Sequence, residues 1–132
     1  MHVTGQCHCG ALAYEAEIDP EGVTICHCTD CQTMSSSAYR TSVRVEEADF
    51  RMLAGEPTLY RKTGDSGRER VQGFCAVCGT QIYSLGDGVY SVRVGAMRER
   101  AKLPAKRQIW CRSALEWTQD LTDLPRNERE GE

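Results

Sequence analysis

Alternating apolar and polar residues along much of the chain predict short β-strands. In the stretch ALAYEAEI, one face of an extended backbone would carry Leu12, Tyr14 and Ala16, because successive side chains of a strand point to opposite sides. The stretch AYRTSVRVE repeats the alternation, with Val43 and Val45 on one face. No part of the chain keeps the 3.6-residue period of a long helix. The pattern therefore favours a fold built mainly from β-sheet.

Turn residues divide this pattern into many short elements. Residues 19–22 (DPEG) are typical of a turn, and residues 86–88 (GDG) indicate a hairpin between two alternating stretches. Residues 64–67 (GDSG) are expected to form a loop between two further strands. Residues 46–53 favour a short helical turn, and residues 106–117 a late strand. The expected fold is mainly β, with small antiparallel sheets and few or no long helices.

The length of 132 residues suits one domain with one core. No internal repeat or linker divides the chain. We expect a single domain over residues 1–125 and a polar, charged C-terminal tail over residues 126–132, which should fray.

Composition and charge narrow the classes of function. The first ten residues lack the apolar run of a signal peptide, and no segment approaches the roughly 18 apolar residues that cross a bilayer. We therefore expect a cytoplasmic protein with no membrane partner. The formal charge of −3 offers no overall attraction for nucleic acid. Residues 60–72 and 97–107 are basic; they are interpreted as solvated surface charge, with a docking surface for an acidic small molecule as the alternative.

Eight cysteines in a reducing compartment indicate metal binding or catalysis rather than disulfides. Cys7 and Cys9 are two residues apart, so both side chains reach the same face of an extended segment. Cys75 and Cys78 form a C-x₂-C pair followed by Gly79, which is typical of a zinc knuckle. Two such pairs complete a Cys₄ tetrahedron. A zinc ion there would tie the first strands to the middle of the chain.

A second group, Cys26, Cys28 and Cys31, supplies three sulfurs from one short segment. Three local ligands leave a fourth position for water or substrate, as in catalytic zinc sites. The alternative is a second structural zinc that the protein itself completes. Candidates for that fourth ligand are Cys111, Asp30, His27 and His8.

Most of these candidates have a simpler interpretation. Cys111 stands alone in the predicted late strand, on the same face as Ile109, and is expected to be a small core residue. His27 and His8 each lie between two cysteines, so in an extended segment they would point away from the metal. A thioredoxin-like redox centre would require a βαβ unit, and the pattern contains none.

Five stretches of the chain together form a signature: GQCHCGALAYE, CHCTDCQ, FCAVCGTQIY, QIWCRSALEW and, near the end, DLP. In this signature the chain resembles the family of glutathione-dependent formaldehyde-activating enzymes, which includes centromere protein V. The resemblance runs from Gly5 to about Pro125. It implies a zinc-bound set of antiparallel sheets of the β-tent type, with two zinc ions per chain. By motif, the structural zinc would be held by Cys7, Cys9, Cys75 and Cys78, and the active-site zinc by Cys26, Cys28 and Cys31.

The resemblance also implies a function: a zinc-dependent carbon–sulfur lyase that acts on a thiol–aldehyde adduct, as in glutathione plus formaldehyde giving S-hydroxymethylglutathione. The alternative is a non-enzymatic, zinc-stabilised module that binds a thiol metabolite or a protein. The expected partner is a small thiol such as glutathione, and a homodimer is one candidate for the oligomeric state of the chain. An anionic thiol would need a basic side chain at the rim of the site, such as Arg40 or Arg61.

One segment departs from the family. Members often carry a basic residue and a glycine soon after the third cysteine, whereas this chain has QTMSSSAY over residues 32–39. The segment is expected to line the open metal position. Thr33 and the serines at positions 35, 36 and 37 would then be available to hydrogen-bond a polar ligand, with an ordinary polar loop as the alternative.

Overall fold

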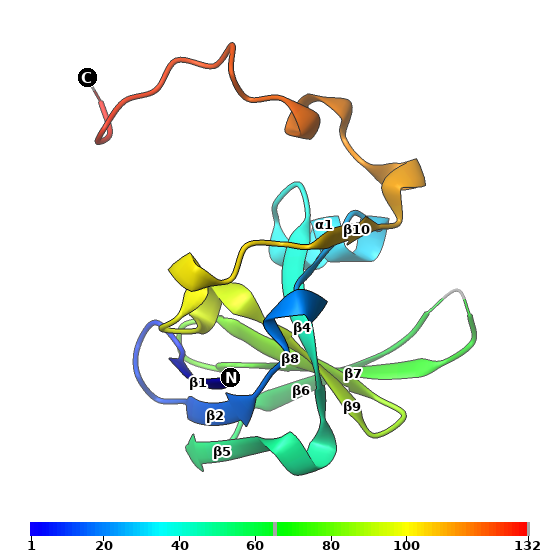
Figure 1. Ribbon diagram of the computed structural model, residues 1–132. Helices are drawn as coiled ribbons and strands as arrows, with labels where there is room; N and C mark the ends of the chain where they lie inside the picture. The colour runs from blue at the N-terminus through cyan, green and yellow to red at the C-terminus, as the bar shows by residue number, and fades with distance from the viewer. Residues whose placement is uncertain (65, 132) are drawn as a thin grey trace.

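The computed structural model describes residues 1–64 and 66–131 and is mainly β, as expected, with two sheets (Figure 1). The smaller sheet has the strand order β1-β2-β5. Its strands are β1 (His2–Gln6), β2 (Ala13–Glu17) and β5 (Phe50–Ala54). The described residues contain one short α-helix, α1 (Thr29–Ser35).

The larger sheet has seven strands in the order β10-β3-β4-β9-β8-β7-β6. Its strands are β3 (Thr24–Cys26), β4 (Arg40–Glu46), β6 (Thr58–Thr63), β7 (Glu69–Phe74), β8 (Gln81–Gly86), β9 (Val89–Arg93) and β10 (Arg107–Ile109). Neighbours pair antiparallel except at one edge, where β10 runs parallel to β3. The expectation of purely antiparallel sheets is therefore wrong at this edge. The long connection after β9 brings the chain back in the same direction as β3, which parallel pairing requires.

The predicted alternation of buried and exposed positions is confirmed in both stretches that carried it. Leu12, Tyr14 and Ala16 are buried, and so are Val43 and Val45 on β4. These side chains face the core between the two sheets. The same alternation turns the other residues of β4 toward the opposite face of the larger sheet.

Aromatic rings join the two sheets in the core. Phe50 of β5 stacks on Tyr14 with ring centroids 5.3 Å apart and on Tyr90 of β9 at 4.4 Å. Tyr83 of β8 meets Phe50 edge-on at 5.5 Å. The glycine at position 5 is required because a Cβ there would lie 2.3 Å from the Tyr14 ring. Gly5 therefore leaves the space that the ring of Tyr14, its cross-strand partner in the smaller sheet, occupies.

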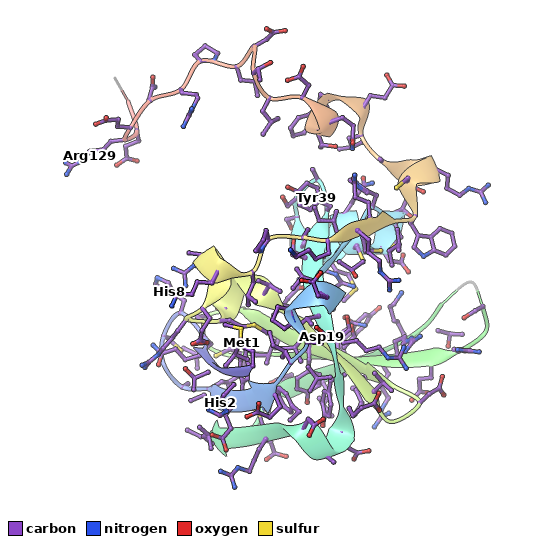
Figure 2. The ribbon with its side chains drawn as sticks, viewed as in Figure 1. Met1, His2, His8, Asp19, Tyr39 and Arg129 are labelled. Carbon is purple, nitrogen blue, oxygen red and sulfur yellow. The ribbon has the colours of Figure 1, made fainter. Side chains whose placement is uncertain are left out.

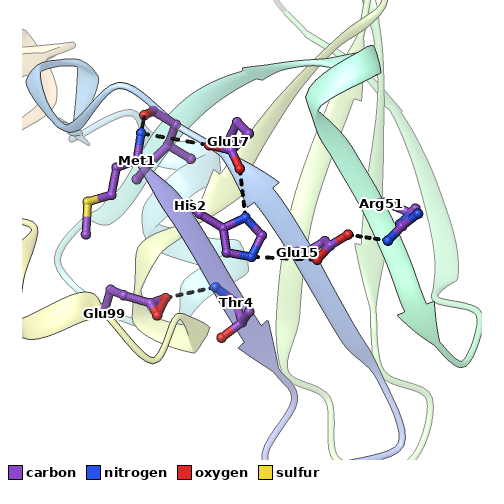
Figure 3. A network of polar contacts seen from close by, with 8 residues as sticks. Met1, His2, Thr4, Glu15, Glu17, Arg51 and Glu99 are labelled. Atoms are coloured by element: carbon purple, nitrogen blue, oxygen red, sulfur yellow. Dashed lines mark hydrogen bonds and ion pairs between the residues drawn. The ribbon is translucent and has the colours of Figure 1, made fainter.

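Polar contacts hold the N-terminal strand in place (Figure 3). His2 Nδ1 lies 2.7 Å from Glu17 Oε1, across the β1–β2 pair. The backbone N–H of Thr4 donates to Glu99 Oε1 at 2.8 Å, which ties β1 to the segment that follows β9. The pattern analysis did not single out β1, because HVTGQ is short and only weakly apolar.

The structure contains the turns that the sequence predicts around β5 and between the later strands. Asp87 and Gly88 form the predicted hairpin between β8 and β9, both with positive φ angles of 54° and 73°. Residues 46–53 contain the expected short helical turn at Glu47–Asp49, after which β5 begins. The predicted loop at residues 64–67 joins β6 to β7, and position 65 within it lies outside the described residues.

The predicted late strand is much shorter than expected. It ends at Ile109 because Trp110 adopts a left-handed conformation with φ 57°. Cys111 then begins a 3₁₀ turn and is exposed, so its interpretation as a core residue of a strand is wrong. The chain beyond this point leads away from the sheets (Figure 1). Among the described residues, no helix has the length and apolar character to cross a membrane.

Candidate metal centres

The structure brings the first four cysteines together. The sulfurs of Cys7, Cys9, Cys75 and Cys78 all lie within 4.8 Å of one another. Cys9 Sγ is 3.6 Å from Cys7 Sγ and 3.7 Å from Cys75 Sγ. A tetrahedral zinc with bonds of about 2.3 Å to sulfur places its ligands about 3.8 Å apart. The four thiols therefore fit zinc both in ligand type and in spacing.

Two tight turns present these sulfurs. After β1 ends, the backbone N–H of Leu12 donates to Cys7 Sγ at 3.2 Å. In the second turn the N–H of Gly79 donates to the carbonyl of Cys75 at 2.9 Å, and Gly79 has a φ of +77°, a conformation that side chains disfavour. The sequence C-x₂-C-G thus forms the expected knuckle.

Thr80 favours the thiolate of Cys78. Its hydroxyl lies 3.2 Å from Cys78 Sγ, and hydrogen bonds from the Thr80 side chain and backbone lower the pKa of Cys78 to about 5. Thr80 Oγ1 also accepts the backbone N–H of His8 at 3.1 Å. The residue after the glycine therefore links the two turns and stabilises the charged form that binds a metal ion.

The second group lies where β3 meets α1. The sulfurs of Cys26, Cys28 and Cys31 also lie within 4.8 Å of one another. Cys28 caps the helix, since its sulfur accepts the backbone N–H of Cys31 at 3.2 Å. Cys31 is buried, whereas Cys26 and Cys28 are half-buried. Three thiols from one segment thus face a common point that remains accessible.

Charge is divided unequally among these thiols. Hydrogen bonding from Cys26, together with the positive charge of Arg40, lowers the pKa of Cys31 to about 5. The same hydrogen bond and burial raise the pKa of Cys26. At neutral pH the metal-free group therefore holds a thiolate at Cys31, and Cys26 releases its proton when a metal ion binds.

No fourth His, Cys, Asp or Glu of the described residues joins this group. Asp30 forms an ion pair with Lys62. His8 and Cys111 are exposed and lie outside both sulfur groups.

His27 points away from the sulfurs, as the spacing predicts. It is buried, its Nε2 lies 2.7 Å from Gln108 Oε1, and its ring meets Tyr39 edge-on at a centroid distance of 5.4 Å. Figure 2 labels Tyr39 beside α1. His27 therefore helps to hold β10 against β3.

The first part of the segment after Cys31, residues 32–35, belongs to α1 and is not a polar loop, which was the alternative interpretation of residues 32–39. The capping sulfur of Cys28 starts α1, and Ser36 ends it with a left-handed φ of 52°. Ser35 Oγ donates to the Cys31 carbonyl at 2.6 Å, so this hydroxyl is already engaged by the helix. Gln32 Nε2 donates to the carbonyl of Ser113 at 2.9 Å and fixes the start of the C-terminal segment.

Sequence reasoning missed Arg93 and gave only a rim position to Arg40. Both are buried, with exposed fractions of 7% and 9%. Arg40 Nη1 and Arg93 Nη2 donate to the same Gln72 Oε1, at 3.3 and 3.1 Å. The other expected rim residue, Arg61, pairs with Glu69 at 2.8 Å on the exposed part of β6. The alternation in VYSVR could have identified Arg93. Arg93 directly follows the buried Val92, so its side chain points to the other face of the sheet.

Comparisons with known proteins agree with this arrangement. Residues 2–113 match the family model described as "Glutathione-dependent formaldehyde-activating enzyme". A crystal structure of a protein from Rhodobacter sphaeroides is similar in fold, with a TM-score of 0.63 and 20% sequence identity over 80% of this chain and 98% of that one. No curated protein matches this chain.

Proposed function

The chain belongs to the family of glutathione-dependent formaldehyde-activating enzymes, and on that basis we propose that it is a zinc-dependent carbon–sulfur lyase. Its reaction would join a small thiol to an aldehyde and reverse that step. Glutathione plus formaldehyde giving S-hydroxymethylglutathione is the reaction that the family description favours. The proposed cofactor is two zinc ions per chain, one for each cysteine group.

The difference between the two cysteine groups is the observation that carries this proposal. Four sulfurs surround the first position, and a closed set of four is typical of structural zinc. Only three surround the second position among the described residues. An open fourth position is typical of zinc sites at which a substrate binds. We therefore assign the structural zinc to Cys7, Cys9, Cys75 and Cys78. The catalytic zinc is assigned to Cys26, Cys28 and Cys31.

The residues around the second group support thiol chemistry. When bound, a zinc ion would supply a Lewis-acidic position that stabilises a thiolate or polarises a carbonyl. Three thiolates and Zn²⁺ together carry a net charge of −1, which repels a further anionic sulfur. After the hydrogen bond from Cys26, the positive charge of Arg40 also lowers the pKa of Cys31, and this charge offsets the excess. The buried arginine thus makes the open position more favourable for a thiolate.

A second candidate function is a non-enzymatic module that binds a thiol metabolite or a protein. It is favoured by the absence of any carboxylate or imidazole from the second sulfur group, among the residues described. A general acid or base would otherwise help to transfer the proton between the thiol and the carbonyl oxygen. The two functions share the ligand and differ in turnover.

Zinc-edge X-ray absorption of the zinc-loaded protein tests the open position. With glutathione, the average number of sulfurs per zinc should rise from about 3.5 to about 4, given one Cys₄ and one Cys₃ site. Binding should strengthen as pH rises toward the free thiol's pKa of about 8.5, since the thiolate is the ligand. An unchanged sulfur number with every thiol tried would refute the proposal. Exchange measured by NMR between glutathione and formaldehyde then separates the enzyme from the binding module.

We further propose a homodimer and a cytoplasmic location. The C-terminal segment exposes Trp117, Leu121 and Leu124, each more than half accessible to solvent. Figure 2 shows the segment extending to Arg129, far from the sheets. A second copy would remove these apolar side chains from water. Light scattering should give twice the chain mass, and removal of residues 114–132 should give the monomer.

A cytoplasmic location agrees with eight free cysteines.

A further inference from the structure

One face of the larger sheet forms a groove of about 460 Å³ beside the second cysteine group. Cys26 and Cys31 line the groove. We call it the cationic groove, after the seven basic residues that line it: Arg40, Arg44, Lys62, Arg68, Arg70, Arg93 and Arg107. Asp87 is the one acidic residue among its described lining.

The strand alternation explains why so many cations share one face. On β4, Val43 and Val45 fill the core, so Arg40, Ser42 and Arg44 must point to the opposite side. The other strands of the sheet behave in the same way. A groove whose lining residues come from strands β10 to β6 therefore gathers basic residues that lie far apart in the sequence.

Most of these cations have no acidic partner. Lys62 pairs with Asp30, and Arg68 pairs with Asp87 at 3.5 Å. The other five form no ion pair with any carboxylate that the structure describes. The excess is unusual for a chain whose formal charge is −3.

Two of the unpaired cations form the floor of the groove. Arg93 and Arg40 are more than nine-tenths buried, and the Nε–H of each has no hydrogen-bond partner in the part of the chain that the structure describes. Burial, together with the charge of Arg40, lowers the pKa of Arg93 to about 9, so it stays protonated at neutral pH. Two buried guanidinium groups that share one acceptor are unfavourable unless anions lie close to them, and the thiolates of the second cysteine group supply part of that negative charge.

We propose that the cationic groove binds the anionic part of the thiol ligand and selects a thiol that carries several phosphate or carboxylate groups. The proposal rests on the function proposed above, because the thiol end would lie at Cys26 and Cys31. Guanidinium groups bind phosphate and carboxylate through paired hydrogen bonds. The sheet curves around the groove, because Arg40 of β4 donates to Gln72 of β7 at 3.3 Å and Lys62 of β6 pairs with Asp30, next to Cys31. A ligand at the cysteines can therefore also contact cations from distant strands.

Calorimetry on the zinc-loaded full chain provides the test. The probes are glutathione, coenzyme A, neutral 2-mercaptoethanol and S-methylglutathione, which keeps the carboxylates but lacks a free thiol. The test variant is Arg44→Gln combined with Arg70→Gln. The matched control is Arg61→Gln, because Arg61 is a surface residue of the same sheet that does not line the groove.

The groove variant should weaken binding of the anionic probes at least tenfold and leave 2-mercaptoethanol within twofold of the parent. The control should stay within twofold for every probe, and added salt should weaken only the anionic probes. Tighter binding of coenzyme A than of glutathione would identify phosphate as the preferred group, and the reverse would identify carboxylate.

Two outcomes separate this proposal from the proposed function. In the first outcome, S-methylglutathione binds less tightly to the Arg44 and Arg70 variant, as glutathione does, but no thiol adds sulfur to zinc. This result would support the groove proposal and reject the lyase. In the second outcome, glutathione adds sulfur to zinc but binds the groove variant and the control with equal affinity. This result would reject the groove proposal and would still support the lyase. Binding only to a polyanion such as heparin would also overturn the proposal.

Discussion

Loss of one ligand from the four-cysteine group should unfold the protein. We expect Cys78→Ser to release one zinc and to give an unfolded or aggregated product. The reason is that this group joins segments far apart in the chain: Cys9 and Cys75 are 66 residues apart and their sulfurs lie 3.7 Å from each other. The free energy of metal binding at such a site is part of the free energy of folding.

The magnitude follows from the length of the closed loop. If a metal cross-link is treated like a disulfide, closing a loop of 66 residues stabilises the folded chain by about 4 kcal/mol. For a domain of 132 residues, with about 2.1 cal/mol/K of unfolding entropy per residue, this corresponds to a fall of about 14 °C in Tm. Lost coordination bonds add to this figure. Since domains are stable by only about 5–15 kcal/mol and zinc binding at such sites contributes about 10–16 kcal/mol, the folded state should be largely lost.

Zinc content and thermal unfolding followed by circular dichroism measure this effect. Val77→Ser is the matched control, because Val77 lies in the same turn, is 79% exposed and supplies no sulfur. The control should keep two zinc ions and the Tm of the parent. A well-folded Cys78→Ser protein with the parent's Tm would show that the four cysteines do not hold the fold together.

Three further substitutions test other parts of the structure. Cys28→Ser should lower bound zinc by about one equivalent with the sheets still folded, because its group ties no distant strands together; global unfolding would contradict the assignment. Cys111→Ala should keep both zinc ions and change stability by less than about 0.5 kcal/mol, since the side chain is exposed; loss of one zinc would make it a ligand. Gly5→Ala should cost about 1–3 kcal/mol, because its Cβ would overlap the buried Tyr14 ring. Gly95→Ala is the control and should not lower stability, because the space around its Cβ is open. Equal melting temperatures of the two variants would refute the argument.

The sequence was sufficient to predict which cysteines come together. Ligand spacing in C-x-C and C-x₂-C is set by local backbone geometry, so it can be read without knowledge of the fold. The buried faces of β2 and β4 could be predicted for the same reason. The parallel edge strand β10 could not, because its pairing with β3 depends on the path of the chain after β9. The left-handed Trp110 that ends β10 also had no signal, since such residues seldom adopt positive φ.

The cationic groove shows why net charge alone was a poor guide to the ligand. A formal charge of −3 sums over the whole surface, whereas a ligand in the groove responds mainly to charges within a Debye length of about 8 Å. Alternation within each strand sends basic side chains of separate segments to one face, so the excess appears only when the strands are placed in order. The basic stretch at residues 60–72 supplied Lys62, Arg68 and Arg70 to that face, whereas Arg61, the neighbour of Lys62, points to the other side. For a strand, the unit that predicts a binding surface is therefore every second residue, not the charged stretch itself.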